Sequence, residues 1–241
     1  MWQTKLGRCI YVSPSGYKVY QNVGYRWLTL GSNALQTVIN RRNPQIPVLH
    51  YLPALSLMVR TFPNKCCLLG LGGGGIAHML SSYTTSQPIT AVDCSEEVIQ
   101  TAKHFFSVDS ISNLIIVHQN ALDYVNECTL EYPHIMVDLY GANQFPAECA
   151  TAAFFNNCKS RLAPDGFIAV NLANLKEQWP IFQLIKQQFK TTIVIPVKRC
   201  ANMIIIASKN EDSDFFITKL RATDELKKII RIQPWGYVGI L

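Results

Sequence analysis

Acidic residues are missing from the first 92 positions of this 241-residue chain, and Asp93 is the first Asp or Glu. Residues 1–92 carry eight Lys and Arg, whereas residues 93–241 carry 14 basic and 16 acidic residues. The formal net charge of +6 therefore arises in the N-terminal part, which is typical of a surface for an anionic partner or of a solvated basic face. Nucleic acid is disfavoured as that partner, because no recognisable nucleic-acid-binding module accompanies these dispersed charges.

Long apolar runs and paired cysteine motifs are also absent. No uncharged apolar run approaches the ~18–20 residues that a membrane span needs, and no secretory signal pattern follows Met1. None of the eight cysteines forms a C-x-x-C pair, which disfavours a zinc ribbon or a thioredoxin motif. The adjacent Cys66 and Cys67 are interpreted as core residues. We expect a cytoplasmic protein that enters no membrane and binds no metal.

What the sequence does contain is typical of a globular α/β protein, with 49% hydrophobic and 16% charged residues. Residues 1–48 have short strand patterns joined by turns such as Asn22-Val23-Gly24, and predict an N-terminal β-hairpin domain. Strands and helices then alternate. The predicted strands are Cys66–Leu71, Ile89–Asp93, Leu114–His118, His134–Leu139, Phe167–Leu172, Thr191–Pro196 and Met203–Ser208.

Continuous apolar strands separated by helices predict a Rossmann-like, mostly parallel sheet in a domain of residues 49–209, with its last strand reversed. The helices expected within it include His50–Phe62 and Ala147–Leu162, the second ending at Pro164-Asp165-Gly166. Residues 210–241 form a C-terminal extension. Within it, Thr223–Ile230 has a helical pattern, and Trp235–Leu241 is apolar enough to pack against the core or against a partner subunit.

A glycine-rich loop is the first candidate binding feature. Gly70, Gly72 and Gly74 follow a predicted strand and precede a predicted helix, where glycines let the backbone approach a nucleotide or nucleoside closely. Asp93 ends the next strand 23 residues after Gly70 and can accept hydrogen bonds from both ribose hydroxyls. The alternative is a glycine-rich turn in a sheet that binds nothing.

Two further polar positions follow buried strands. Asn120-Ala121 comes after the third strand of the large domain, where a side-chain amide can hold the exocyclic amine of adenine or cap a helix. Asp138 comes at the carboxyl end of the fourth strand, beside the topological switch point where open sheets bind ligands. Its carboxylate could anchor a cation, accept a proton from an amine, or cap the following turn.

Together these motifs resemble the seven-stranded methyltransferase fold that binds S-adenosyl nucleosides, and within it the spermidine synthase (polyamine aminopropyltransferase) family. The N-terminal hairpins, the stretch Gly31–Gln36 and Tyr51 support that choice, and the resemblance extends to about Lys209. It implies a homodimeric transferase that moves the aminopropyl group of decarboxylated S-adenosylmethionine to an amine acceptor. The implied roles are ribose binding by Asp93, adenine binding by Asn120 and Ala121, nucleoside contact by Gln36, proton abstraction by Asp138, and a substrate groove lined by Tyr51 and Tyr140.

The sequence departs from the family pattern mainly where a diamine would bind. Gly73 stands where the family has the acid that grips the aminopropyl ammonium, and Leu52-Pro53 follow Tyr51 in place of the family's His or Gln and Glu. Other departures are Leu139-Tyr140-Gly141-Ala142 after the catalytic acid, Val197-Lys198-Arg199-Cys200 between the last two strands, and Asn120 for the usual Asp. Because acids are lost and cations gained, we expect an altered diamine site and an acceptor that is an amine or an anion.

Three alternatives to aminopropyl transfer remain open. One is a methyltransferase that uses intact S-adenosylmethionine, since the loss of the acid at Gly73 leaves room for the methionine carboxylate. Another is a nucleoside-binding or interaction protein without catalysis. An NAD-dependent dehydrogenase is the weakest of the three, since only the glycine loop and Asp93 would permit it.

Overall fold

The protein, represented by a computed structural model, is described for residues 2–31, 34–141 and 144–241, and for Trp2 by its backbone alone. A short 3-10 turn, η1 (Trp2–Thr4), precedes a four-stranded antiparallel sheet in the order β1-β2-β3-β4. Its strands are β1 (Arg8–Val12), β2 (Tyr17–Gln21), β3 (Tyr25–Leu30) and β4 (Thr37–Asn40). The predicted turn at Asn22 joins β2 to β3, because Asn22 Oδ1 accepts hydrogen bonds from the N–H groups of Gly24 and Tyr25.

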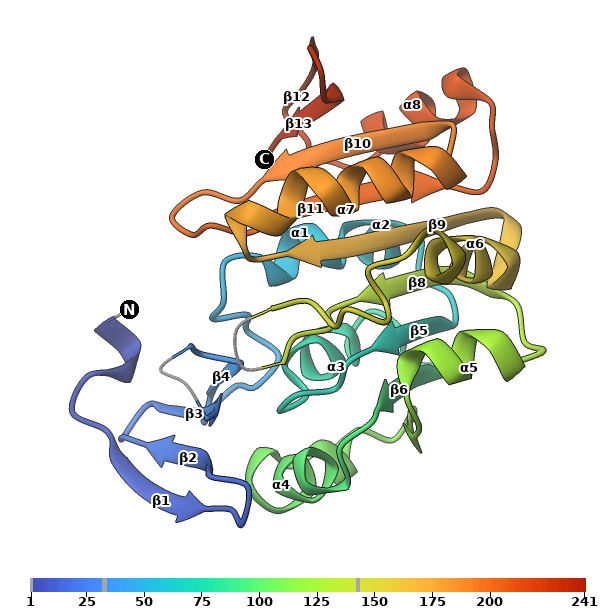
Figure 1. Cartoon of the computed structure of the whole chain (residues 1–241). Coiled ribbons are helices and arrows are strands. Elements are labelled where there is room, and N and C mark those ends of the chain that lie inside the picture. Colours follow the sequence, from blue (N-terminus) through green and yellow to red (C-terminus); the bar gives the residue numbers. More distant parts are fainter. Residues whose placement is uncertain (1, 32–33, 142–143) are drawn as a thin grey trace.

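A nine-stranded sheet forms the rest of the core, in the order β12-β13-β10-β11-β9-β8-β5-β6-β7 (Figure 1). Its first five strands in sequence are parallel, and β11 is antiparallel to both of its neighbours, as expected for a reversed last strand. These strands are β5 (Cys66–Leu69), β6 (Ile89–Asp93), β7 (Leu114–His118), β8 (Tyr132–Val137), β9 (Leu162–Leu172), β10 (Thr191–Pro196), β11 (Met203–Ser208), β12 (Lys228–Ile232) and β13 (Gly236–Ile240).

Helices cover both faces of this sheet, so the expected three-layer α/β fold is confirmed (Figure 1). One face packs against α1 (Leu52–Leu55), α2 (Leu57–Thr61), α3 (Gly75–Leu80), α4 (Glu96–Phe106) and α8 (Ser213–Arg221). The other packs against α5 (Ala121–Glu127), α6 (Ala152–Arg161) and α7 (Leu175–Gln188). A 3-10 turn, η2 (Val108–Ser110), follows α4. Among the described residues, no helix is both long and apolar enough to cross a membrane.

Two predicted helices differ from the structure at their ends. The segment His50–Phe62 forms two short helices that meet at Ser56, whose hydroxyl donates to the carbonyl of Leu52. The helix expected from Ala147 begins only at Ala152, because Thr151 accepts a hydrogen bond from the N–H of Phe154 and so caps it. It ends at Arg161, and β9 begins at once with an irregular register opposite Tyr132.

The C-terminal extension corrects the sequence prediction most clearly. The expected helix at Thr223–Ile230 is wrong, since β12 occupies Lys228–Ile232 and pairs with β13. Ile229, Ile230 and Ile232 are β-branched and favour a strand once a partner is available. The second expectation for this segment is confirmed: β13 pairs in parallel with β10 and Val238 is buried, so the hairpin enlarges the seven-stranded sheet to nine strands.

Candidate active site

A cavity of about 1520 Å³ opens at the carboxyl ends of the parallel strands, where the N-terminal sheet meets the large sheet. Its wall is formed by the segments around β4, α1, the glycine loop, and the loops after β6, β7, β8 and β9, together with the β10–β11 hairpin. Residues 32, 33 and 142, which belong to two stretches used for the family resemblance, lie outside the described residues. The cavity lies at the carboxyl ends of the parallel strands, beside the topological switch point where the sequence predicted ligand binding.

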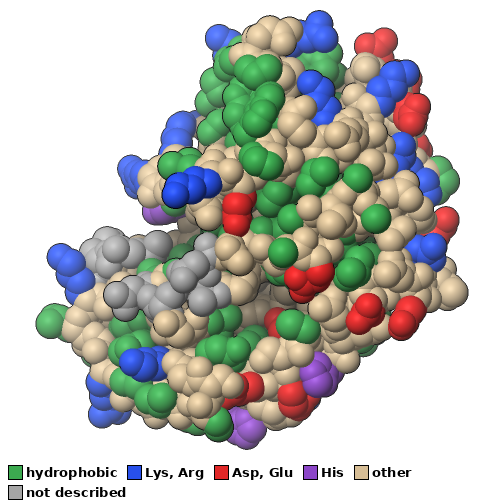
Figure 2. Space-filling view, viewed as in Figure 1, with side chains coloured by type: hydrophobic (Ala, Val, Ile, Leu, Met, Phe, Trp, Pro, Cys, Tyr) green, Lys and Arg blue, Asp and Glu red, His purple; other side chains and the backbone are tan. Residues whose placement is uncertain are grey.

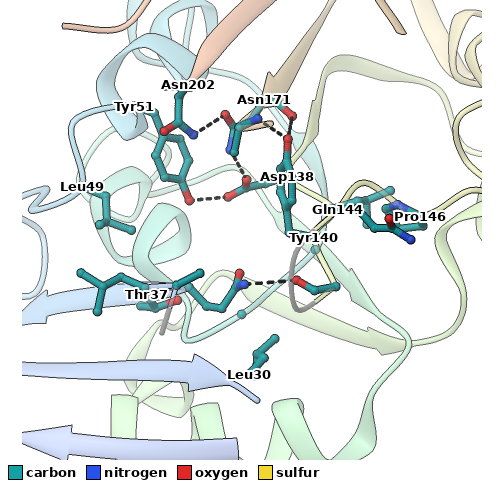
Figure 3. Close-up of a pocket in the computed structure, with 18 of the residues that line it drawn as sticks. Leu30, Thr37, Leu49, Tyr51, Asp138, Tyr140, Gln144, Pro146, Asn171 and Asn202 are labelled. Carbon is teal, nitrogen blue, oxygen red and sulfur yellow. Dashed lines mark hydrogen bonds between the residues drawn. The ribbon is translucent and has the colours of Figure 1, made fainter. Parts of the chain in front are cut away.

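Asp138 lies on this wall, directly after β8, at the centre of a hydrogen-bond network (Figure 3). Its Oδ2 accepts a hydrogen bond from the Tyr51 hydroxyl at 2.8 Å, and its Oδ1 accepts one from Asn171 Nδ2 at 2.7 Å. Asn202 Nδ2 donates in turn to Asn171 Oδ1 at 2.8 Å. This last bond fixes the orientation of the Asn171 amide, so that its donor group faces the carboxylate.

Burial raises the pKa of the Asp138 carboxyl, while the hydrogen bonds from Asn171 and Tyr51 oppose that rise. The pKa of Tyr51 lies well above its ordinary value, because the side chain is buried and the negative charge of Asp138 disfavours a phenolate. The proton between these two residues therefore stays on Tyr51. Asp138 is then an oriented carboxylate with an elevated proton affinity, which suits a general base.

The second predicted groove residue, Tyr140, also lies on the cavity wall. Its hydroxyl donates to the Asn171 carbonyl at 3.3 Å and accepts a hydrogen bond from the N–H of Ala173. Burial raises the pKa of this phenol, so it stays protonated at neutral pH. Tyr140 thus ties the loop after β8 to the loop after β9 and presents its ring to the cavity (Figure 3).

The glycine loop joins β5 to α3, as predicted, and all three expected glycines have positive φ, at 100° for Gly70, 52° for Gly72 and 75° for Gly74. A Cβ on Gly70 would lie 2.3 Å from the Asp138 carbonyl oxygen, so only glycine lets the loop pass this close to β8. Gly70 and Gly72 line the cavity. Gly74 packs beneath the loop instead, where a Cβ would lie 2.4 Å from Val108 Cγ1.

Asp93 ends β6, and its carboxylate holds the glycine loop. Asp93 Oδ2 accepts hydrogen bonds from the N–H groups of Leu71 at 3.0 Å and Gly72 at 3.3 Å, and Oδ1 accepts one from Ser95 at 3.0 Å. The sequence suggested the role of this acid toward a ribose but not its role inside the protein. Asp93 lies on the cavity wall beside the loop, and its oxygens can share further donors there.

The other predicted nucleoside contacts lie on the same wall. Asn120 caps α5 by accepting a hydrogen bond from the N–H of Leu122 at 2.8 Å, so the capping alternative is confirmed. Ala121 follows it in the first turn of α5. Gln36 precedes β4 and donates through Nε2 to the carbonyl of Gly141 at 3.2 Å, which connects the two halves of the cavity wall.

Sequence reasoning missed Thr37, which occupies the space next to Gly73. Thr37 Oγ1 accepts a hydrogen bond from the N–H of Gly73 at 2.8 Å. A Cβ on Gly73 would lie 2.9 Å from Thr37 Cγ2 and 3.1 Å from Phe106 Cδ1. The absence of a side chain at position 73 is thus built into the packing. Asn171 was missed as well, although it is the penultimate residue of a buried strand, β9, just as Asp138 directly follows one. Asn202 carried no signal in the sequence.

The charges on the cavity wall are few. Its carboxylates, among the described residues, are Asp93, Asp138 and Glu148. None of the eight basic residues of positions 1–92 lies on the wall, and Figure 2 shows several blue side chains over the N-terminal part of the molecule. Of the two cations expected beside the acceptor groove, Arg199 lines the cavity, whereas Lys198 does not and instead donates to the carbonyl of Leu241 at 2.9 Å. In the part of the chain that the structure describes, no three His, Cys, Asp or Glu side chains are grouped to hold a metal.

Comparison with known proteins places this architecture in a family. The model of the spermine/spermidine synthase domain matches residues 49–214, which include the glycine loop, Asp93 and Asp138. The chain belongs to the spermine/spermidine synthase family. The polyamine aminopropyltransferase of Chromobacterium violaceum is 28% identical over 193 residues, covering 78% of this chain and 74% of that protein. Members with that name are transferases.

Solved structures agree on the fold of this spermine/spermidine synthase family member. A probable spermidine synthase from Corynebacterium glutamicum superposes with a TM-score of 0.72 at 17% identity, covering 91% of this chain and 87% of that one. Human methyltransferase-like protein 13 superposes with a TM-score of 0.61 at 17% identity, covering 73% and 91%. The methyltransferase-type fold expected from the sequence is therefore confirmed.

Proposed function

We propose that the chain binds an S-adenosyl sulfonium nucleoside and transfers an alkyl group, the aminopropyl group, from its sulfur to an amine acceptor. The observation that carries the proposal is the Asp138 carboxylate, held by Tyr51 and Asn171 on the wall of the same cavity as the glycine loop. The family and the 28% identity to a polyamine aminopropyltransferase agree with it.

The reaction would be a direct displacement. The lone pair of the acceptor amine forms a bond to the carbon next to the sulfonium, the carbon–sulfur bond breaks, and its electron pair leaves sulfur neutral as a thioether. The proton lost from the amine passes to Asp138, whose pKa is raised by burial and which is therefore suited to receive it. The sulfonium is already activated, so the protein mainly positions and desolvates the two reactants.

The nucleoside would occupy the part of the cavity between the glycine loop and the loop after β7. Asp93 would accept hydrogen bonds from the ribose hydroxyls, and Asn120 and Ala121 would border the adenine. Gln36 would contact the nucleoside from the N-terminal side. This assignment is supported by the presence of all four residues on one wall.

The acceptor site would differ from that of a usual diamine-binding member. No acidic side chain projects from Gly73, and Leu52-Pro53 stand where acceptor-binding polar residues are expected. A buried ammonium without a carboxylate partner costs several kcal/mol, so a dication would be poorly held. We accordingly propose an amine acceptor bound through Asp138 at one end.

Methyl transfer from intact S-adenosylmethionine is the second candidate, and the absence of an acid at Gly73 favours it. The space beside Gly73 is filled by Thr37 and Phe106, so the room expected there for the methionine carboxylate is not present on that side. An intact donor needs no such acid and would be repelled by one. A cytoplasmic location and a homodimer, both predicted from the sequence, also remain predictions.

Isothermal titration separates these candidates when combined with product analysis. The purified chain is titrated with S-adenosylmethionine, its decarboxylated form and 5′-deoxy-5′-methylthioadenosine, and incubated with each donor and a panel of amines. Aminopropylated product from the decarboxylated donor supports the proposal. Methylated product from the intact donor supports the second candidate, and the absence of binding to all three nucleosides contradicts both.

A further inference from the structure

The charged residues of the cavity wall are separated along its length. Asp93 and Glu148 mark the nucleoside end: burial raises the pKa of the Cys94 thiol, and the charges of these two carboxylates raise it further. Burial also raises the pKa of the Cys149 thiol, and the charge of Glu148 raises it further. Glu148 therefore lies within electrostatic range of Cys94, the residue that follows Asp93.

Two adjoining segments of the wall carry cations: the end of β9 with the first turn of α7, and the hairpin between β10 and β11, which are joined by the hydrogen bond from Gln178 Nε2 to the carbonyl of Ala201 at 2.6 Å. Each segment contributes one exposed cation to the cavity wall, Lys176 from the first and Arg199 from the second. In the described part of the chain neither forms an ion pair with an acid. Glu177 adjoins Lys176, but its carboxylate accepts the N–H of Phe145 at 3.3 Å and it does not line the cavity.

Arg199 is close in sequence to a residue of the hydrogen-bond network around Asp138. Arg199 lies three residues before Asn202, which is hydrogen-bonded to Asn171 and through it to Asp138. Its backbone has a φ of 68°, a left-handed conformation that non-glycine residues adopt rarely. The turn thus holds an arginine at a strained position on the cavity wall, and its neighbour Lys198 is engaged elsewhere by Leu241.

Charge complementarity indicates what this end can hold. A second ammonium would meet these two cations, because the carboxylate of Asp138 is engaged by the attacking amine in the proposed reaction. A carboxylate would instead gain charge-assisted hydrogen bonds. We infer that the end of the cavity formed by Lys176 and Arg199 recognises an anionic group, a carboxylate, of one of the two substrates. This inference rests on the proposed nucleoside and amine sites.

The carboxylate has two possible sources, the methionine part of an intact donor or the far end of an amino-acid-type acceptor. Two matched pairs of probes distinguish them. The donors are S-adenosylmethionine and its decarboxylated form, and the acceptors are 4-aminobutanoate and 1,4-diaminobutane, which share a chain length and differ in the charge of the far group. Affinities are measured by titration, the acceptors in the presence of saturating 5′-deoxy-5′-methylthioadenosine.

Three variants test the cations. Lys176→Gln with Arg199→Asn removes both charges, and asparagine tolerates the left-handed turn. Arg199→Lys keeps the charge. Lys198→Gln is the matched control, because it neutralises the adjacent cation that does not line the cavity. We expect the double variant to bind the carboxylate-bearing probe of one pair about tenfold or more weakly than the wild type does. Its affinity for the probe without the carboxylate should be unchanged or higher. Arg199→Lys and Lys198→Gln should bind all probes as the wild type does.

An effect on the donor pair assigns the carboxylate to the donor, and an effect on the acceptor pair assigns it to the acceptor. Equal affinities within both pairs, or a preference of the wild type for 1,4-diaminobutane that the double variant does not change, overturn the inference. Failure of the proposed function has a different signature, since the wild type then binds none of the nucleosides.

Discussion

The hydroxyl of Tyr51 donates a hydrogen bond to Asp138 Oδ2 at 2.8 Å, across 87 positions of the sequence. Tyr51 immediately precedes α1, and Asp138 follows β8, so the contact forms only when the segment after the N-terminal sheet packs against the end of the large sheet. Asn171 completes the environment of the carboxylate from a third element, β9. The proposed base is therefore oriented by elements that the chain brings together from three separate regions.

Replacement of Asp138 by Asn is expected to abolish turnover and spare nucleoside binding. The loss of a general base lowers kcat by about 10²–10⁴-fold, while the glycine loop and Asp93 remain in place. Because burial raises the pKa of Asp138, the folded state favours the protonated form, and this group stabilises the fold less as the pH rises through that pKa. The uncharged variant should thus unfold at the same or higher urea concentration at pH 7. Unchanged turnover would remove Asp138 from the mechanism.

The pH dependence of kcat/KM should report the same carboxyl. Activity is expected to fall on the acid side at a pH above the ordinary range of an aspartate, since the base must be ionised and burial raises its pKa. Tyr51→Phe removes a donor that stabilises the ionised form, so the acid limb should move to still higher pH. Tyr140→Phe is the control, because its hydroxyl bonds Asn171 and Ala173 but not the carboxylate. If Tyr51→Phe does not change the pH at which kcat/KM falls on the acid side, Asp138 is not the group that titrates there.

An acidic side chain at Gly73 is expected to destabilise the fold. Gly73→Asp places a Cβ against Thr37 and Phe106, and overpacking of this kind lowers the free energy of unfolding by about 1–3 kcal/mol. The same change at Gly24, where a Cβ would meet nothing within 4 Å, serves as control. Urea unfolding of both variants and of Gly73→Asp with Thr37→Ala measures the effect. We expect the double variant to recover part of the loss, and additive effects would argue against contact between positions 37 and 73.

Asp93 should matter for the glycine loop as well as for the nucleoside. Asp93→Ala leaves the N–H groups of Leu71, Gly72 and Ser95 without their acceptor, which is expected to cost about 1–3 kcal/mol of stability and most of the nucleoside affinity. Asp109→Ala, an exposed acid in η2, is the control. Wild-type affinity for 5′-deoxy-5′-methylthioadenosine in the Asp93 variant, measured by titration, would contradict the assignment.

Acid should destabilise the fold through His134. Burial lowers the pKa of this imidazole to about 4, although its hydrogen bond to the carbonyl of Phe62 opposes the shift. In the unfolded chain the imidazole takes up a proton near pH 6.5, whereas in the folded chain it stays neutral until about pH 4. The free energy of unfolding therefore keeps its full value above pH 6.5 and decreases as the pH falls toward 4. We expect a loss of about 3 kcal/mol over that window. His134→Gln should make the free energy of unfolding depend less on pH between 4 and 6.5, and His118→Gln, at an exposed position, should not. Equal pH profiles of urea unfolding for the wild type and both variants would contradict this role of His134.

Much of the site could be predicted from the sequence because its residues sit where strands end. Gly70, Asp93 and Asp138 each follow a continuous apolar run, and the carboxyl ends of parallel strands converge on one edge by topology. The same rule would have pointed to Asn171, the penultimate residue of β9. The hairpin β12–β13 could not be recognised in this way, because a short amphipathic segment at a sheet edge has no periodicity that excludes a helix.

By itself the sequence determined the order of strands and helices in residues 49–209, the glycine loop with its acid, and the absence of carboxylates from residues 1–92. These depend on local periodicity, backbone conformation and residue type, which are readable without contacts. Only the tertiary structure decided that Thr37 fills the space beside Gly73, that Tyr51 and Asn171 orient Asp138, and that none of the eight early bases lines the cavity while Arg199 does. These are contacts between segments far apart in the chain, and they are set by how the two sheets pack together.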